Sequence, residues 1–296
     1  GMKRFEEKRD GVLTFADLRR PRAKIGYWIM FVMLLVVALI CLIPPLWLFL
    51  SSFKTSTELM QIPPTLFPET FSLSKVATIW KKQQFLKTYA NTMILAAGSV
   101  VSAVVINGLA GYVLGCLKPK GSKTVFTIIL WTMLMPTTLS MVPLYKNFIS
   151  LPILGINLTN TFVPMWLCAG ASAFNILLFK NAFESIPPSL LEAARLDGCG
   201  NVGIFTRIVL PLSLPIIMVV SIFTVNGTWG DFLLPYLVLT DSNKQTVMIS
   251  IYKFSGALPL DERLMSLVFA ILPPSILFFF FQKHIMSGAT MGSIKE

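Results

Sequence analysis

The stretch IGYWIMFVMLLVVALICLIPPLWLFLSSF, Ile25–Phe53, decides the class of fold. It contains 29 consecutive residues without an Asp, Glu, Lys or Arg. About 18 mostly apolar residues are enough for a helix to cross the hydrocarbon core of a bilayer. Apolar and polar side chains do not alternate along it, as they would in a membrane β-strand. We therefore predict a membrane-spanning helix, because a helix satisfies its own backbone hydrogen bonds in lipid.

Five further charge-free stretches of 19 to 33 residues follow it. In the whole chain of 296 residues, 54% are hydrophobic and only 13% are charged, whereas about a quarter are charged in a soluble domain. This composition excludes a soluble enzyme, a secreted disulfide scaffold and a disordered protein. We predict an all-α integral membrane protein with six transmembrane helices. Their approximate ranges are Ile25–Leu50, Tyr89–Cys116, Thr124–Leu144, Asn160–Phe179, Leu210–Leu233 and Leu264–His284.

Basic residues predict the orientation of these helices. If the amino terminus is cytoplasmic, 16 of the 25 Lys and Arg residues lie on the inner side, so the positive-inside rule places both termini in the cytoplasm. We interpret residues 1–24 as a basic cytoplasmic segment beside anionic lipid, in preference to a nucleic-acid-binding segment. Residues 25–285 form the predicted transmembrane domain, with a cytoplasmic loop at 180–209, and residues 286–296 form a cytoplasmic tail.

Catalytic and metal-binding patterns are absent from the sequence. It has no GxxxxGK[ST] phosphate-binding loop, no C-x-x-C pair among its four cysteines, and a single histidine, His284. We therefore predict no catalytic residue, no metal site and no cofactor bound by this chain.

The loop at 180–209 carries the most information about function. It reads KNAFESIPPSLLEAARLDGCGNVGIFTRIV and continues as LPLSLP. Ser189 and Glu192 have the spacing of a capping box, after Pro187 and Pro188. Gly198 suits the left-handed position that ends a helix. A helix of about two turns is thus expected between the capping box and Gly198.

This loop resembles the signature of the permease subunits of ABC importers. That pattern is Glu-Ala-Ala, three residues, Gly, nine residues, and Ile-x-Leu-Pro, and every specified position is filled here. The resemblance implies the type I importer permease fold and a coupling helix that docks into a groove on a separate ATPase subunit. The coupling residues that it implies are Glu192, Ala193, Ala194, Asp197, Gly198, Ile208, Leu210 and Pro211. Ala193 and Ala194 are small enough for a partner to approach the backbone closely.

The flanking sequences resemble the carbohydrate-uptake branch of these permeases, specifically the smaller subunit of the maltose-type pair. The likeness is carried by three stretches, AFNILLFKNAFESIP, TWGDFLLPYLVLTD and the tail GATMGSIKE. The tail differs from the commoner carboxy-terminal sequence of that subunit at Ser293, Ile294 and Glu296. It implies a second permease subunit, two ATPase subunits that bind ATP and Mg, an extracytoplasmic solute-binding protein and a sugar substrate. It also implies a multi-pass location in the bacterial cytoplasmic membrane.

Polar residues inside the predicted spans are candidates for a substrate path. They are Asn175, Asn226, Trp229 and Asp231, with Asn107 and Thr228 as weaker candidates. A buried carboxylate is costly in a bilayer and is expected to face protein or water. Each residue also has a structural interpretation, since asparagines hydrogen-bond between helices and Trp lies in the interfacial belt.

Three alternatives remain open at this stage. The first is an importer permease for a non-sugar solute, such as a phosphodiester or a small osmolyte. The second is an independent secondary carrier or channel, and the third is a membrane enzyme. A secondary carrier is disfavoured because no internal repeat is evident. A membrane enzyme is disfavoured because no nucleophile and base are paired in the sequence.

Overall fold

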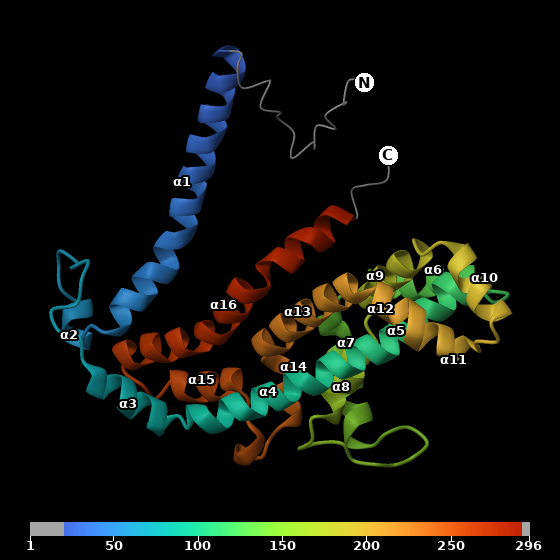
Figure 1. Cartoon of the computed structure of the whole chain (residues 1–296). Helices are drawn as coiled ribbons and strands as arrows, with labels where there is room; N and C mark the ends of the chain where they lie inside the picture. Colours follow the sequence, from blue (N-terminus) through green and yellow to red (C-terminus); the bar gives the residue numbers. More distant parts are fainter. Residues whose placement is uncertain (1–20, 292–296) are drawn as a thin grey trace. The chain divides into compact units, whose positions relative to one another are not determined.

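The computed structural model describes the backbone of residues 21–291 and the side chains of residues 24–136 and 138–282. Within these residues the secondary structure is helical and contains no β-strand, which confirms the predicted all-α class (Figure 1). The chain divides into two compact units, Gly1–Ser72 and Leu73–Glu296. The predicted segment 1–24 falls almost entirely outside the described residues, as do Ser293, Ile294 and Glu296 of the tail.

The first unit consists of one long helix and a short folded segment. Helix α1, Pro21–Ser52, contains the stretch predicted as the first span, and the mean hydropathy of its most apolar window is 2.9. It continues through Pro44 and Pro45, although each proline removes one backbone donor. The four-residue helix α2, Ser56–Leu59, follows and is capped by Thr55.

Polar contacts hold the proline-containing segment that follows α1. The Lys54 ammonium lies 4.8 Å from the centre of the Trp47 ring and also donates to the carbonyl of Thr65. The Glu58 carboxylate accepts the backbone amide of Glu69 at 3.0 Å. These contacts join the start of the segment to its end, so the region beyond α2 is ordered without regular structure. The prolines at 63, 64 and 68 account for this irregularity.

A continuous helix of 33 residues, Phe85–Leu117, is the centre of the second unit. It consists of α4 (Phe85–Ser102), α5 (Gly108–Tyr112) and two π-helical turns at Ala103–Asn107 and Val113–Leu117. Its mean hydropathy of 2.0 suits a membrane span, and its range confirms the prediction at Tyr89–Cys116. Figure 1 shows α4 running beside α13, on which it packs directly, while α5 packs on α9.

Small residues let this central helix approach its neighbours closely. A Cβ atom added to Gly98 would lie 2.2 Å from the Trp166 ring, and one added to Gly111 would lie 2.6 Å from Cβ of Phe179. At Gly115, a Cβ would lie 2.9 Å from the backbone carbonyl of Lys180. Gly111 and Gly115 are four residues apart, the spacing by which membrane helices pack at short distance without a hydrophobic driving force.

Three of the remaining predicted spans are interrupted. The range Thr124–Leu144 is not one helix, which corrects the prediction: α6 ends at Thr132 and α7 begins at Thr137. Pro136 has extended backbone angles, and a proline disfavours helical geometry at the residue before it. The predicted fourth span is bent by 44° between α8 and α9, and the fifth by 79° between α12 and α13.

The 79° bend is centred on Ser213 between two prolines. Pro211 and Pro215 each lack a backbone N–H, so the carbonyls four residues before them receive no helical hydrogen bond from those positions. The Ser213 amide donates to the carbonyls of Val209 and Leu210 at 3.1 Å each. A kink at closely spaced prolines is the expected result. The described helices of the second unit are α3 (Leu73–Lys82), α4, α5, α6 (Ser122–Thr132), α7 (Thr137–Ile149), α8 (Val163–Gly170), α9 (Ala173–Glu184), α10 (Pro188–Leu196), α11 (Asn201–Ile204), α12 (Leu210–Leu212), α13 (Leu214–Gly230), α14 (Leu233–Val238), α15 (Val247–Ser255) and α16 (Leu260–Met291).

The described residues contain three helices long and apolar enough to cross a membrane, or up to five if each bent pair is one span. The count of six therefore stays a prediction. Helix α16 runs to Met291, beyond the predicted end at His284.

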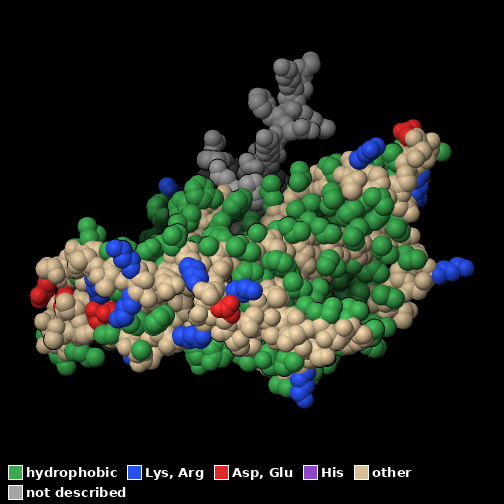
Figure 2. All heavy atoms as spheres, turned by 90° about the horizontal axis from the view of Figure 1, so that it is seen from below, with side chains coloured by type: hydrophobic (Ala, Val, Ile, Leu, Met, Phe, Trp, Pro, Cys, Tyr) green, Lys and Arg blue, Asp and Glu red, His purple; other side chains and the backbone are tan. Residues whose placement is uncertain are grey.

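Figure 2 shows one face of the molecule, where hydrophobic side chains outnumber the charged ones, which lie in small groups. Such a surface is typical of a protein that faces lipid.

The close approach of α5 and α9 can be tested by adding a single methyl group. Gly111→Ala places its Cβ against Phe179 and the backbone of Lys180. We expect a loss of about 1–3 kcal/mol in stability, as in other overpacked contacts. The control is Gly108→Ala on the same helix, whose Cβ meets only Phe205 at 3.8 Å, and which should be neutral or stabilising. The thermal midpoint of the purified protein in nanodiscs distinguishes them; equal midpoints would contradict this packing.

Candidate functional site

Helix α10 begins two residues earlier than the predicted capping box places it, because that motif makes Ser189 the N-cap residue. It starts at Pro188, with Pro187 at the N-cap position and no side-chain cap hydrogen bond. Ser189 therefore lies inside the first turn, and the predicted capping box with Glu192 is wrong. A proline at the first helical position explains the shift, because its missing N–H would be unpaired there in any case and its φ is already helical.

The end of α10 agrees with the prediction. Gly198 has a φ of +82°, in the left-handed region that a side chain disfavours. Its amide donates to the Arg195 carbonyl at 3.0 Å, and the amide of Cys199 donates to the Ala194 carbonyl at 2.9 Å. These two bonds form a Schellman motif, which satisfies the last carbonyls of a helix and turns the chain away.

The inner face of α10 is buried in the chain's own core. Leu191 and Ala194 are 8% and 7% exposed and belong to a hydrophobic cluster of eleven buried residues, four of them aromatic. The prediction that Ala193 and Ala194 both face a partner is therefore wrong for Ala194. Residues three apart lie on one face of a helix, which explains why Ala194 follows Leu191 inward. We call this cluster the loop core: Ala103, Tyr112, Phe179, Phe183, Ile186, Leu191, Ala194, Ile204, Phe205, Val209 and Val220.

The outer face of α10 is exposed. Glu192, Ala193 and Asp197 are all exposed, and the side chain of Leu196 is 89% exposed. Ala193 and Leu196 are three residues apart and share the face opposite Leu191. An almost fully exposed leucine beside a small residue and two carboxylates makes this face a candidate docking surface. The sequence pattern did not single out Leu196.

The remaining signature residues lie beyond α10. Ile208 and Leu210 are partly buried and pack against the loop core, so both support the loop from inside. Pro211 is exposed and lies just before the bend at Ser213. The signature therefore combines one outward-facing helix with residues that shape its attachment to α13.

Contacts between elements fix the loop to the membrane helices. Phe205 lies 5.1 Å from Tyr112, centroid to centroid, and Tyr112 donates to the Asn201 carbonyl at 3.2 Å. At the nearby end of α9, Glu184 pairs with Lys118 at 2.9 Å and with Lys180 at 2.7 Å. These anchors were not predicted from the sequence, although Phe179 and Phe183 are four residues apart, a spacing that places two side chains on one face of a helix.

Asn107 bridges the break between α8 and α9. It is fully buried; its side-chain amide donates to the Ala169 carbonyl at 2.9 Å, and its side-chain oxygen accepts the Ser172 amide at 3.0 Å. The break frees both backbone groups, and leaving them unpaired in an apolar surrounding is costly. Asn107 is therefore structural, in agreement with the helix-to-helix interpretation of the sequence.

The four strongest candidates for the substrate path divide between two cavities. Asn175 and Asp231 line a cavity of about 290 Å³. It also carries four hydroxyl groups, so half of its twelve lining residues are polar. They are Leu95, Ser99, Met165, Cys168, Ala169, Ser172, Asn175, Thr224, Gly227, Thr228, Asp231 and Leu234.

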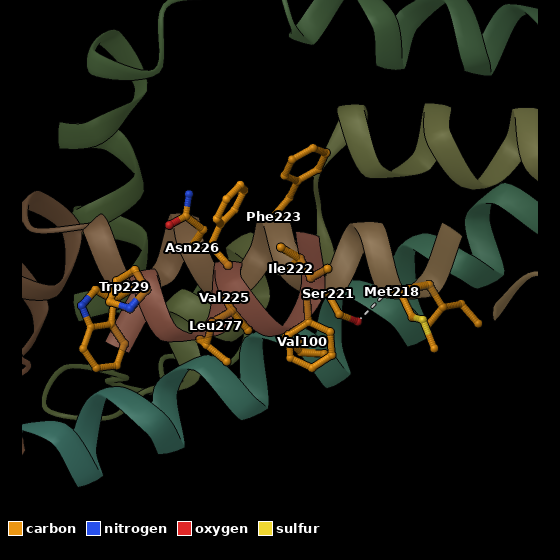
Figure 3. A pocket seen from close by; sticks show the side chains of 13 residues that line it. Val100, Met218, Ser221, Ile222, Phe223, Val225, Asn226, Trp229 and Leu277 are labelled. Carbon is orange, nitrogen blue, oxygen red and sulfur yellow. Dashed lines mark hydrogen bonds between the residues drawn. The ribbon is translucent and has the colours of Figure 1, made fainter. Parts of the chain in front are cut away.

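Asn226 and Trp229 line a different cavity of about 530 Å³, which is almost entirely apolar. Figure 3 shows it between α13 and its neighbours, with Val225, Leu277 and Trp229 along its wall. The structure thus does not bring Asn226 and Trp229 together with Asp231. Among the described residues, no group of three His, Cys, Asp or Glu side chains could hold a metal ion.

Trp229 has a structural partner that accounts for its position. Helix α16 contains Pro273 and Pro274, so the carbonyls four residues earlier, on Phe269 and Ala270, receive no helical amide. The Tyr89 hydroxyl donates to the Phe269 carbonyl, and Trp229 Nε1 donates to the Ala270 carbonyl at 2.9 Å. Trp229 is 3% exposed. Its indole therefore supplies the hydrogen bond that the proline removes, which favours a structural role for this residue over a place in the substrate path.

This role of Trp229 predicts a compensation between two substitutions. Trp229→Phe keeps an aromatic ring but leaves the Ala270 carbonyl unpaired, and should destabilise the protein by about 1–3 kcal/mol. Pro274→Ala restores the backbone donor for that carbonyl. The loss from Trp229→Phe should therefore shrink in the Pro274→Ala background. A double-mutant cycle on thermal midpoints measures the coupling, and strictly additive effects would exclude the proposed pairing.

Comparison with known proteins agrees with these features. Residues 107–289 match the family described as the binding-protein-dependent transport system inner membrane component. The chain is 30% identical to the arabinooligosaccharides transport system permease protein of Halalkalibacterium halodurans, over 94% of this chain and all of that protein. It is 29% identical to the polygalacturonan/rhamnogalacturonan transport system permease protein of Bacillus subtilis, over 88% of this chain and 95% of that one.

A solved structure shows the same fold. It is a bacterial ABC transporter involved in the import of the acidic polysaccharide alginate, with a TM-score of 0.76 and 25% identity. The match covers 89% of this chain and 98% of that one. The described helices therefore form the permease fold of an ABC importer, and the chain belongs to the family of binding-protein-dependent transport system inner membrane components.

Proposed function

We propose that this chain is the transmembrane permease subunit of an ATP-driven importer for sugars or oligosaccharides. The observation that carries the proposal is α10, which has one face sealed into the loop core and the opposite face exposed. The family match supports an inner-membrane transport subunit. The printed names of the relatives support sugars as the substrate class.

The importer that this subunit requires contains a second permease subunit, two ATPase subunits and an extracytoplasmic solute-binding protein. ATP and Mg bind to the ATPase subunits, and this chain performs no hydrolysis. A related alginate transporter has been solved in complex with a periplasmic protein bound to an alginate pentasaccharide, which supports the place of a binding protein in this assembly.

The outer face of α10 is the proposed contact with the ATPase. Leu196 supplies an apolar contact, and Ala193 permits close approach. The carboxylates of Glu192 and Asp197 lie at the edge of this contact. Charges there orient the two subunits relative to each other more than they strengthen ATPase binding.

The buried face of α10 transmits the motion. Phe205 and Tyr112 connect α11 and its π-helical turn to the central helix, and Phe183 connects α9 to the same core. A closely packed core transmits displacement instead of absorbing it. Closure of the ATPase would therefore move the loop and the attached helices as a rigid body, which is how such bundles alternate access.

The orientation proposed for the chain places both termini and α10 in the cytoplasm. The excess of Lys and Arg in residues 1–24 and around Lys118–Lys123 supports it. An importer permease for a non-sugar solute remains the second candidate, because α10 and its docking face are independent of the transported solute. An independent carrier is disfavoured, because it would have no use for an exposed α10 face.

The docking face can be separated from the loop core by two neighbouring substitutions. Ala193→Trp adds a large side chain to the exposed face, so the permease should insert normally while ATPase binding and solute uptake fall at least about tenfold. That factor corresponds to a loss of about 1.4 kcal/mol in binding. Ala194→Trp instead overfills the buried core and should lower the thermal midpoint of the permease itself.

These variants are compared at matched permease levels, by pull-down of the ATPase subunits and by solute uptake. Asn201→Ala is the control, because the Asn201 side chain is exposed and only its backbone carbonyl accepts the Tyr112 hydroxyl. Parental uptake and ATPase binding in Ala193→Trp would show that this face is not the docking surface.

The orientation has its own test. Asn201→Cys in a background lacking the four native cysteines places a thiol at an exposed position beside α10. An impermeant maleimide should label it in inverted vesicles and not in intact cells, because the loop is proposed to be cytoplasmic. Labelling in intact cells would reverse the proposed topology.

A further inference from the structure

The polar cavity between α4, α8, α9 and α13 has a composition suited to a polyhydroxylated solute. Its polar lining consists of hydroxyls, an amide and a carboxylate, contributed by Ser99, Ser172, Asn175, Thr224, Thr228 and Asp231. These groups donate and accept hydrogen bonds, as recognition of a sugar requires. A volume of about 290 Å³ is at the lower end of small-molecule sites, so it accommodates one end of an oligosaccharide.

Several of these groups are free to bind a solute. Within the described residues, the hydroxyls of Thr224 and Thr228 and the side-chain amide of Asn175 make no hydrogen bond to another protein group. Asn175 is only 8% exposed. Buried polar groups in proteins are normally hydrogen-bonded, and an amide that lines a cavity without a protein partner is placed to bind its occupant.

The cavity carries charge of one sign. Asp231 is its only ionisable carboxylate, and none of the lining residues is a Lys, Arg or His. This carboxylate lies near the backbone amides of Phe232, Leu233 and Leu234, just before α14 begins at Leu233. Leu95, Met165 and Leu234 supply apolar walls, and walls of low dielectric concentrate the field of a single charge.

We propose that this cavity is a solute-contact site of this subunit, and that it accepts uncharged sugar residues and rejects uronic acids through Asp231. The inference rests on the proposed function and narrows its substrate class. A uronate carboxylate entering the cavity would face a fixed negative charge and find no cation to pair with, and placing like charges together costs free energy. The hydroxyls of a neutral sugar would instead pair with Asp231, Asn175 and the threonines.

Cys168 provides a direct probe, because it lines the same cavity. Cys41, Cys116 and Cys199 are first replaced by Ser in the assembled importer. Cys168 is then modified with two methanethiosulfonates of similar size, one carrying a trimethylammonium group and one a sulfonate. Their rate ratio, normalised to the ratio for free cysteine, reports the field in the cavity, since the reactivity of the thiol cancels.

We expect the cationic reagent to react at least about tenfold faster than the anionic one after normalisation. Asp231→Asn should bring the ratio close to that of free cysteine. Asp241→Asn is the matched control, because Asp241 caps a short turn outside the cavity and should leave the ratio unchanged. A normalised ratio near one in the parental protein, or failure of both reagents to reach Cys168, would overturn the proposal.

Protection by substrate completes the test. Galactotriose, a neutral trisaccharide, and trigalacturonate, its acidic counterpart, are each added at millimolar concentration during labelling. Neutral sugar should slow the modification of Cys168 several-fold, and the uronate should not. Equal protection by both, or none by either, would refute the cavity assignment. A separate measurement of sugar uptake by the importer tests the proposed function itself, so a negative result there is distinguishable from a failure of charge selection.

Discussion

Every break in a membrane helix leaves backbone groups that must find a new partner, and this constraint organises the second unit. Pro273 and Pro274 free two carbonyls of α16, which Tyr89 and Trp229 satisfy from α4 and α13. The break between α8 and α9 frees a carbonyl and an amide, which Asn107 satisfies together. Water is absent from the bilayer core, so these bonds are conditions for the bent helices to exist there.

The same bonds also determine which helices are neighbours. Tyr89 and Trp229 connect α16 to two helices at adjacent residues, and Asn107 connects the central helix to both halves of the bent pair. Close packing at Gly111 of α5 and at Gly115 of the following π-helical turn brings the central helix onto α9, four and eight residues after Asn107. The central helix therefore contacts the break between α8 and α9 through Asn107, packs on α9 through its glycines, and contacts the loop core through Tyr112. We infer that a displacement of α10 also displaces this helix.

The sequence predicted the helical class, three of the spans and the end of α10, because each depends on a local rule. Apolar length predicted Ile25–Leu50 and Tyr89–Cys116, and the positive φ of Gly198 followed from the preference of glycine for a helix C-terminus. The same rules failed at Pro136, which divides the predicted third span, and at Pro188, which starts α10 before Ser189. Both errors come from giving proline less weight than hydropathy or capping.

Tertiary partners could not be predicted from one sequence. Nothing local distinguishes Ala193 from Ala194, yet one is exposed and the other is sealed by Leu191 and its aromatic neighbours. Asn107, Asn175, Asn226 and Trp229 are all polar residues in apolar stretches. Only the packed structure shows that Asn107 and Trp229 hydrogen-bond to backbone carbonyls left unpaired at helix breaks, whereas Asn175 lines a polar cavity.

Helix α13 connects the two regions to which we assign a function, the loop core and the polar cavity. Its start is joined to the loop by the bend at Ser213, and Val220 packs within the loop core. Thr224 and Thr228, four and eight residues further on, line the polar cavity, and the next residue, Trp229, hydrogen-bonds to α16. A rigid helix displaced at one end carries all three positions with it. In the proposed mechanism, motion of the loop reaches the cavity through this one helix, because α13 places Val220 in the loop core and Thr224 and Thr228 in the cavity wall.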